Sequence, residues 1–353
     1  MINLRHFLYA FVMCICAAAL SSCEHRELTD PTDVHYIRVY LDEQIKNVTY
    51  GFYNEEYEHP EFSSPLNMNI ALASPYTGEV IFEGLLRTQG KDARGRYIDG
   101  YIKANPGTYN LVMYQVGSSV THIRYPGNYY DIQAYTSPVS DRILGYLPET
   151  SKVLDSEKIM QEPEHLLVSR YDNLMVEHSM TVDTLKTADG DHFTASSIVK
   201  SYYIQLRVTG LEWVRSAAAV LSGMSGSSRL CKEDGMIEED PINLYFSMNP
   251  GNRSTAEDTK TSTATLYSTF STFGKIPDLL SELTLSFEFG KSDGSTQVEE
   301  FDISEAFKTP LAIENQWILL DKEITITKPV GGGSGGMEPG VEGWEEEDAD
   351  LYM

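Results

Sequence analysis

Apolar and polar residues alternate along most of this chain, and this alternation limits the possible folds more than any other feature of the sequence. In the run 35–41 (HYIRVYL), Ile37 and Val39 fall on one face, and Tyr and Arg residues fall on the other. The same period of two recurs in residues 67–73, 79–86, 109–116, 202–208, 243–248, 263–270, 283–289 and 317–326. Because Gly, Pro, Asn and Asp separate these runs, the pattern predicts an all-β chain built from antiparallel sandwiches.

The runs fall into two groups, which predicts two tandem domains. We place an N-terminal β-sandwich domain at residues 35–178 and a C-terminal one at 179–329, sizes that are ordinary for single domains. Between the groups, residues 137–166 alternate weakly and hold three prolines. We expect a short helix near 151–160 in this region. In the first domain, the polar stretch 88–96 reads as a loop with several basic residues.

The N-terminus has the layout of an export signal. Arg5 precedes an apolar run at residues 7–20, and small residues then lead to Cys23, which is typical of a signal peptide over residues 1–22. A membrane-spanning helix is the alternative, but it needs roughly 20 apolar residues and this run is shorter. The tetrad ending at Cys23 resembles the lipobox of bacterial lipoproteins. We therefore expect acyl chains on Cys23, which together anchor a protein stably, and a polar tether over 23–34.

Charge and cysteine content exclude some classes of function. The formal net charge is −25 and the sequence pI is about 4.6, which argues against nucleic acid as a partner. Of the four cysteines, Cys14 and Cys16 leave with the signal peptide and Cys23 carries lipid. Only Cys231 then remains, so no intramolecular disulfide can form and the domains must be held by packing.

The end of the chain differs in character from the domains. Residues 331–336 (GGGSGG) form a flexible linker, and the segment 330–353 as a whole is rich in acidic residues. Its last residues alternate again, and Trp344 and Leu351 are apolar residues that could belong to a donor strand. An extended segment on a flexible linker can join another sheet as a donor strand. A tail that only confers solubility is the alternative.

Catalytic motifs do not stand out in this sequence. It holds no HExxH, CxxC or GxGxxG pattern, and the dense polar cluster at 189–192 (DGDH) lacks the further ligands of a Ca²⁺ loop. We therefore predict a protein that is not an enzyme and that has no cofactor and no metal site.

Tyrosines crowd the stretch 125–135 (YPGNYYDIQAY). Exposed tyrosines offer rigid, amphipathic contact area, so Tyr125, Tyr129 and Tyr130 are candidates for recognition of glycans or protein partners. The alternative is that these rings pack on the faces of hairpins.

Several stretches in order along the mature chain resemble one known family. They are CEHREL after the signal peptide, PGTYNLVMY (106–114), AVLSGMSGS (219–227), STFGK (271–275), ENQWILLDKEITI and the terminal VEGWEEED. This order resembles the Bacteroidetes lipoproteins related to the FimB/Mfa2 fimbrial anchor subunits. The resemblance implies two transthyretin-like sandwich domains and a place in fimbriae, the type V pili.

In that family, stalk subunits lose an N-terminal strand to a protease, and a strand from a neighbouring subunit fills the groove. Anchor subunits keep the strand and the lipid. By this resemblance, residues 35–41 are the retained strand and the tail, around 340–353, is the donor. Lys91, Arg94 and Arg96 are sites that a trypsin-like protease could cut, so the roles of anchor, tip and stalk stay open at this point.

The sequence thus predicts a lipid-anchored outer-membrane protein at the cell surface. Its expected role is that of a fimbrial anchor or accessory subunit, which meets other fimbrial subunits by strand exchange and supports adhesion. The alternative is a stand-alone surface lipoprotein that binds glycans or host proteins.

Overall fold

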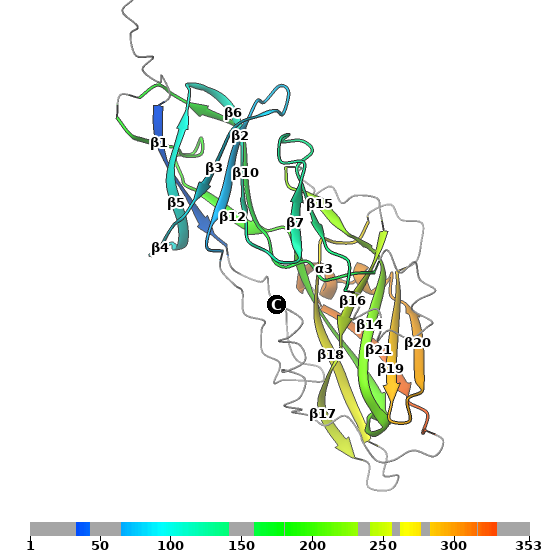
Figure 1. Ribbon diagram of the computed structural model, residues 1–353. Coiled ribbons are helices and arrows are strands. Elements are labelled where there is room, and N and C mark those ends of the chain that lie inside the picture. The colour runs from blue at the N-terminus through cyan, green and yellow to red at the C-terminus, as the bar shows by residue number, and fades with distance from the viewer. Residues whose placement is uncertain are drawn as a thin grey trace, which may run out of the picture.

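The computed structural model describes residues 33–42, 65–140, 159–179, 181–231, 241–255, 262–276, 283–315 and 317–329. Figure 1 shows two β-rich lobes placed end to end, with β7 and β15 near their junction. The predicted all-β class is confirmed, while the transthyretin-like topology stays a prediction. No helix among the described residues is long and apolar enough to span a bilayer.

The N-terminal lobe is a sandwich whose two layers share one strand. One layer has the order β12-β1-β5-β4, with β11 also paired to β1, and the other has the order β3-β2-β6-β10-β12. The strands are β1 (Asp33–Leu41), β2 (Met68–Ala73), β3 (Val80–Leu86), β4 (Thr88–Asp92), β5 (Gly95–Ala104), β6 (Gly107–Gln115), β10 (Leu167–Val176), β11 (Asp183–Thr184) and β12 (Phe193–Ser197).

Alternation explains the packing between these layers. Ile37, Met68 and Leu111 are fully buried in one apolar cluster, and each comes from a different strand of the sandwich. Successive side chains of a strand point to opposite faces, so one apolar residue in two is enough to fill the space between two sheets.

The C-terminal lobe is a second sandwich with a separate core. Its sheets have the orders β17-β18-β13-β21 and β20-β19-β14-β16-β9. In its core the rings of Phe246 and Phe270 stack with centroids 4.7 Å apart. The elements are β9 (Ile159–Met160), β13 (Lys200–Thr209), η3 (Leu211–Trp213), β14 (Val214–Ser225), β16 (Pro241–Ser247), β17 (Asn249–Thr255), β18 (Ser262–Thr272), β19 (Thr284–Lys291), β20 (Thr296–Asp302), η4 (Ala306–Lys308), α3 (Pro310–Asn315) and β21 (Trp317–Thr325).

The two lobes exchange strands at their junction. β9 precedes β10 in the chain but pairs in parallel with β16 of the C-terminal sheet. In return, β15 (Ser227–Arg229) pairs with β8 (Gln133–Thr136), which itself pairs with β7 (Thr121–Arg124). A third apolar cluster joins Tyr129 and Leu166 of the first lobe to Leu230 and Phe273 of the second. The lobes are therefore tied by sheet pairing and packing as well as by the covalent connection.

The strand pairing of the N-terminal sandwich continues past residue 178, near which the alternation places the domain boundary. β11 and β12 still pair with β1 of the N-terminal sandwich, and the C-terminal sandwich takes over only at β13, which begins at Lys200. Alternation alone cannot tell which sheet a strand joins, because that depends on pairing with distant residues. Of the predicted helix near 151–160, only Ile159 and Met160 lie within the described residues, and they form a strand instead.

Partly buried polar groups line the same junction. A Glu162 side-chain oxygen accepts a hydrogen bond from the backbone N–H of Ser271 (2.7 Å), and burial raises the pKa of Glu162 to about 8. The His165 ring lies 3.1 Å from Ser197 Oγ and 2.9 Å from Ser201 Oγ, and burial lowers its pKa. Because burial favours the neutral form of both groups, these two side chains add little charge to the junction.

Candidate functional site

The first strand, β1, lies inside the sheet and has neighbours on both sides. Eight of its residues, Asp33 to Tyr40, pair antiparallel with β5. On its other side it pairs in parallel with β11 at His35 and Tyr36, and with β12 from Val39 to Leu41. Removal of β1 would therefore leave two unpaired strand edges facing a groove, the kind of surface that binds another strand.

The inner face of β1 is part of the core. Ile37 and Val39 are fully buried, opposite Gly100 and Ile98 of β5, and Val39 also lies beside Phe193 of β12. This confirms the alternation predicted for residues 35–41. His35 shares this buried face, and neither of its ring nitrogens has a hydrogen-bond partner within the described part of the chain.

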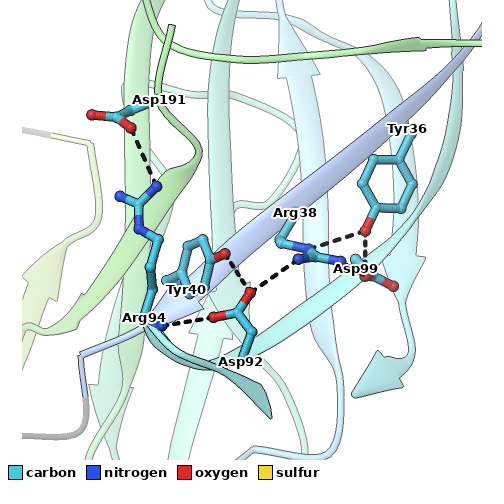
Figure 2. Close-up of polar contacts among 7 residues, drawn as sticks. All are labelled: Tyr36, Arg38, Tyr40, Asp92, Arg94, Asp99 and Asp191. Atoms are coloured by element: carbon cyan, nitrogen blue, oxygen red, sulfur yellow. Dashed lines mark hydrogen bonds and ion pairs between the residues drawn. The ribbon is translucent and has the colours of Figure 1, made fainter. Parts of the chain in front are cut away.

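The outer face of β1 carries a polar network, which we call the clamp: Tyr36, Arg38, Tyr40, Asp92 and Asp99. Figure 2 shows Arg38 between the two carboxylates, with its Nη1 3.2 Å from Asp92 and its Nη2 3.2 Å from Asp99. Arg38 Nε donates to the hydroxyl of Tyr36 (3.0 Å), which in turn donates to Asp99. Tyr40 donates its hydroxyl hydrogen to Asp92 (2.7 Å). Three successive outward side chains of β1 are thus bonded to the β4–β5 hairpin.

The clamp keeps one charge state around neutral pH. Burial, together with the hydrogen bond to Asp99, raises the pKa of Tyr36 to about 12. The Tyr40 hydroxyl and the backbone N–H of Arg94 lower the pKa of Asp92. Tyr36 therefore stays neutral while Asp92 stays ionised, so the bonds to Arg38 do not depend on small changes in pH. The Arg38 guanidinium also lies over the Tyr97 ring, 3.6 Å from its centroid.

The polar stretch 88–96, predicted as a loop, is mostly strand. β4 and the start of β5 form a hairpin, and Arg94 at its turn forms an exposed ion pair with Asp191 (3.2 Å). The hairpin escaped prediction because its sequence is polar on both faces, as suits an edge strand with little apolar burial. Cleavage at Lys91, Arg94 or Arg96 stays a prediction.

Arg38→Ala is expected to lower the free energy of unfolding by about 1–3 kcal/mol, because it leaves the mostly buried Asp99 without its cation. Arg94→Ala is the matched control. Its ion pair is exposed on both sides, and such pairs contribute about 1 kcal/mol at most. Urea unfolding of the two variants measures the difference. Equal losses would mean that the clamp holds β1 no better than a surface ion pair.

The three candidate tyrosines do not share one surface. Tyr129 is 1% exposed and its hydroxyl donates to Asp172 (2.5 Å), so in this conformation its ring packs inside the protein. Tyr130 is partly exposed, and its hydroxyl donates to the Pro75 carbonyl (2.7 Å). Tyr125 is the most exposed of the three, and the left-handed φ of 55° sets its position. Side chains of neighbouring residues in a turn point in different directions, so their spacing in the sequence could not show which of the three tyrosines is buried and which is exposed.

Other predicted residues lie elsewhere or outside the described ranges. Cys23, Trp344 and Leu351 fall outside the described residues. Cys231 is partly buried beside the junction cluster, and burial raises its pKa to about 12, which makes its thiol a poor nucleophile. In the 189–192 cluster, Asp191 pairs with Arg94. Among the described residues, no group of three His, Cys, Asp or Glu side chains is arranged to hold a metal.

Comparison with known proteins gives one clear relative by sequence. "Putative fimbrium anchoring subunit Fim4B" of Bacteroides ovatus is 29% identical over 289 residues, which cover 73% of this chain and 80% of the relative. The chain is thus similar in sequence, over most of its length, to a protein named as a fimbrium anchoring subunit. The resemblance to FimB/Mfa2-type subunits predicted from short motifs is thereby confirmed. A family model described as a domain of unknown function, DUF5119, matches residues 88–246, from β4 of the first sandwich to β16 of the second.

A solved structure supports the fold described above. The crystal structure of a "putative adhesin" from Bacteroides ovatus is similar, with a TM-score of 0.55 and 21% identity over 87% of this chain and 98% of that one. The fimbrial anchor protein Mfa2 from Porphyromonas gingivalis gives a TM-score of 0.46 and 13% identity over 83% and 91% of the two chains.

Proposed function

We propose that this protein is a surface-anchored fimbrial subunit that closes its own strand groove and so ends a polymer. The observation that carries the proposal is the position of β1, which pairs with β5 on one side and with β11 and β12 on the other. A groove that is already filled accepts no strand from a neighbour. The sequence relationship to a fimbrium anchoring subunit supports the same role.

Attachment to the outer membrane belongs to this proposal through Cys23. Acyl chains on that residue would fix the N-terminus, and residues 24–32 would lead from the lipid to β1. A rigid body suits this task, because the strand exchange between the lobes transmits force through backbone hydrogen bonds. The work is mechanical coupling, and we propose no catalysed reaction.

Contact with the next subunit would use the C-terminal tail. A subunit whose own groove is filled can still join a polymer by donating a strand to an open groove elsewhere. Trp344 and Leu351 would then fill side-chain pockets of the partner. A subunit that donates a strand but accepts none is the end of the fibre.

Cys23→Ser tests the anchoring. In the native host, the variant is expected to move from the membrane fraction to soluble material and to release filaments into the medium, because one serine hydroxyl cannot take the thioether-linked lipid. Membrane fractionation and electron microscopy measure both effects. Continued incorporation of labelled palmitate into the Cys23→Ser protein would contradict the proposal. A chain that lacks residues 331–353 serves as the comparison, since it should stay at the membrane and yet carry no filaments.

A further inference from the structure

A hollow at the junction of the two lobes belongs neither to the clamp nor to the proposed contact with a donor strand. It has a volume of about 440 Å³ and is lined by Tyr125, Gly127, Asn128, Asp131, Gln133 and Arg229. The first five belong to the β7–β8 connection and β8, whereas Arg229 comes from β15, which pairs with β8. One side of the hollow therefore depends on the contact between the lobes, and its volume lies in the range of small-ligand sites.

Tyr125 is the aromatic residue that lines this hollow. It is 61% exposed, and its φ of 55° is a left-handed conformation that bulky residues rarely adopt. The Arg124 guanidinium lies 5.6 Å from the centroid of this ring and 5.3 Å from that of Tyr135, so it lies between two aromatic side chains. Backbone strain of this kind persists only where the surroundings hold it, and it is frequent at ligand sites.

The remaining lining is polar and already oriented. Asn128 Oδ1 accepts a hydrogen bond from the backbone N–H of Tyr130 (2.9 Å), which leaves the amide NH₂ of Asn128 as the donor end. Gln133 is buried, and its Oε1 accepts from Arg124 Nε. Asp131 and Arg229 lie 3.8 Å apart, so the hollow carries both signs of charge close together.

This combination fits a sugar better than other ligands. The face of an aromatic ring packs against the C–H face of a pyranose, and amide, carboxylate and guanidinium groups bond its hydroxyls in pairs. An anion would meet Asp131 and a chain of net charge −25. An apolar ligand would take water from Asp131, Arg229 and the amide NH₂ of Asn128 without offering them hydrogen bonds, which is unfavourable. We propose that the hollow binds a neutral hexose unit of a surface glycan.

Saturation-transfer NMR with the methyl glycosides of mannose, galactose and glucose tests this site on the intact soluble protein. At least one glycoside should receive saturation from the wild-type protein. Tyr125→Gly should weaken that binding about tenfold or more, while the thermal midpoint stays equal or rises, because glycine adopts the left-handed φ without strain. Loss of binding thus cannot be ascribed to unfolding.

Tyr101→Ala is the matched control, since Tyr101 on β5 is 68% exposed and lies outside the hollow. It should bind the glycosides as the wild type does. Absence of transfer to all three glycosides, or equal binding by Tyr125→Gly and the wild type, would overturn the assignment. Because neither readout involves filaments, this result is independent of the anchoring role.

Discussion

Ile37→Ala is expected to lower the free energy of unfolding by about 2–5 kcal/mol, a large part of the stability of an ordinary domain. The side chain is fully buried in the N-terminal core, and its removal leaves a cavity between two sheets. Because Ile37 sits in the middle of β1, the loss should also loosen the strand in its groove. Urea unfolding monitored by circular dichroism gives the change directly.

Ile81→Ala makes the same chemical change on β3, where the isoleucine side chain is 62% exposed. It should cost well under half as much, since little apolar area returns to water. A loss for Ile37→Ala no larger than that for Ile81→Ala would mean that β1 is not packed in the core in solution.

In contrast to Ile37→Ala, the substitution His35→Leu is expected to raise the free energy of unfolding, by about 1–3 kcal/mol. The imidazole is buried on the inner face of β1, and neither ring nitrogen has a partner among the described residues. Burial of polar groups without hydrogen bonds costs free energy, and an apolar side chain of similar volume removes that cost. Thermal unfolding of the variant and the wild type measures the gain.

His35→Gln separates polarity from shape. Glutamine keeps polar atoms at the same depth, so this variant should gain nothing. If leucine destabilised the protein by more than about 1 kcal/mol while glutamine was neutral, the imidazole would have to be hydrogen-bonded in solution. The inner face of β1 would then be wetter than the structure indicates.

The inner face of β1 was predictable because burial follows the period of two. The alternation at 35–41 placed Ile37 and Val39 correctly, and these positions need no knowledge of the partner strands. The clamp was not predictable in the same way. Arg38 meets Asp99 only because β1 and β5 pair in one particular register, and Asp92 reaches it through the β4–β5 hairpin. The sequence shows that Arg38 and Asp99 are charged, but it does not show the strand pairing that brings them together.

The connection between the lobes was not predictable for a related reason. The chain enters the C-terminal sheet briefly at β9, returns for β10 to β12, and only then leaves the first sandwich. Short strands such as β9 and β15 carry too few residues to show a period, although they decide how the lobes are joined. The same junction turns Tyr129 inward and leaves Tyr125 outside, a difference that the sequence YPGNYY does not reveal.

Amide hydrogen exchange of residues 33–41 in the purified protein tests the central claim most directly. If β1 is a permanent member of the sheet, its amides should be protected as strongly as those of β5 and β6, and more strongly than those of the edge strand β4. Exchange of residues 33–41 at the rate of an unstructured peptide, with β5 and β6 still protected, would show an open groove. The protein would then accept a strand and could not end a polymer.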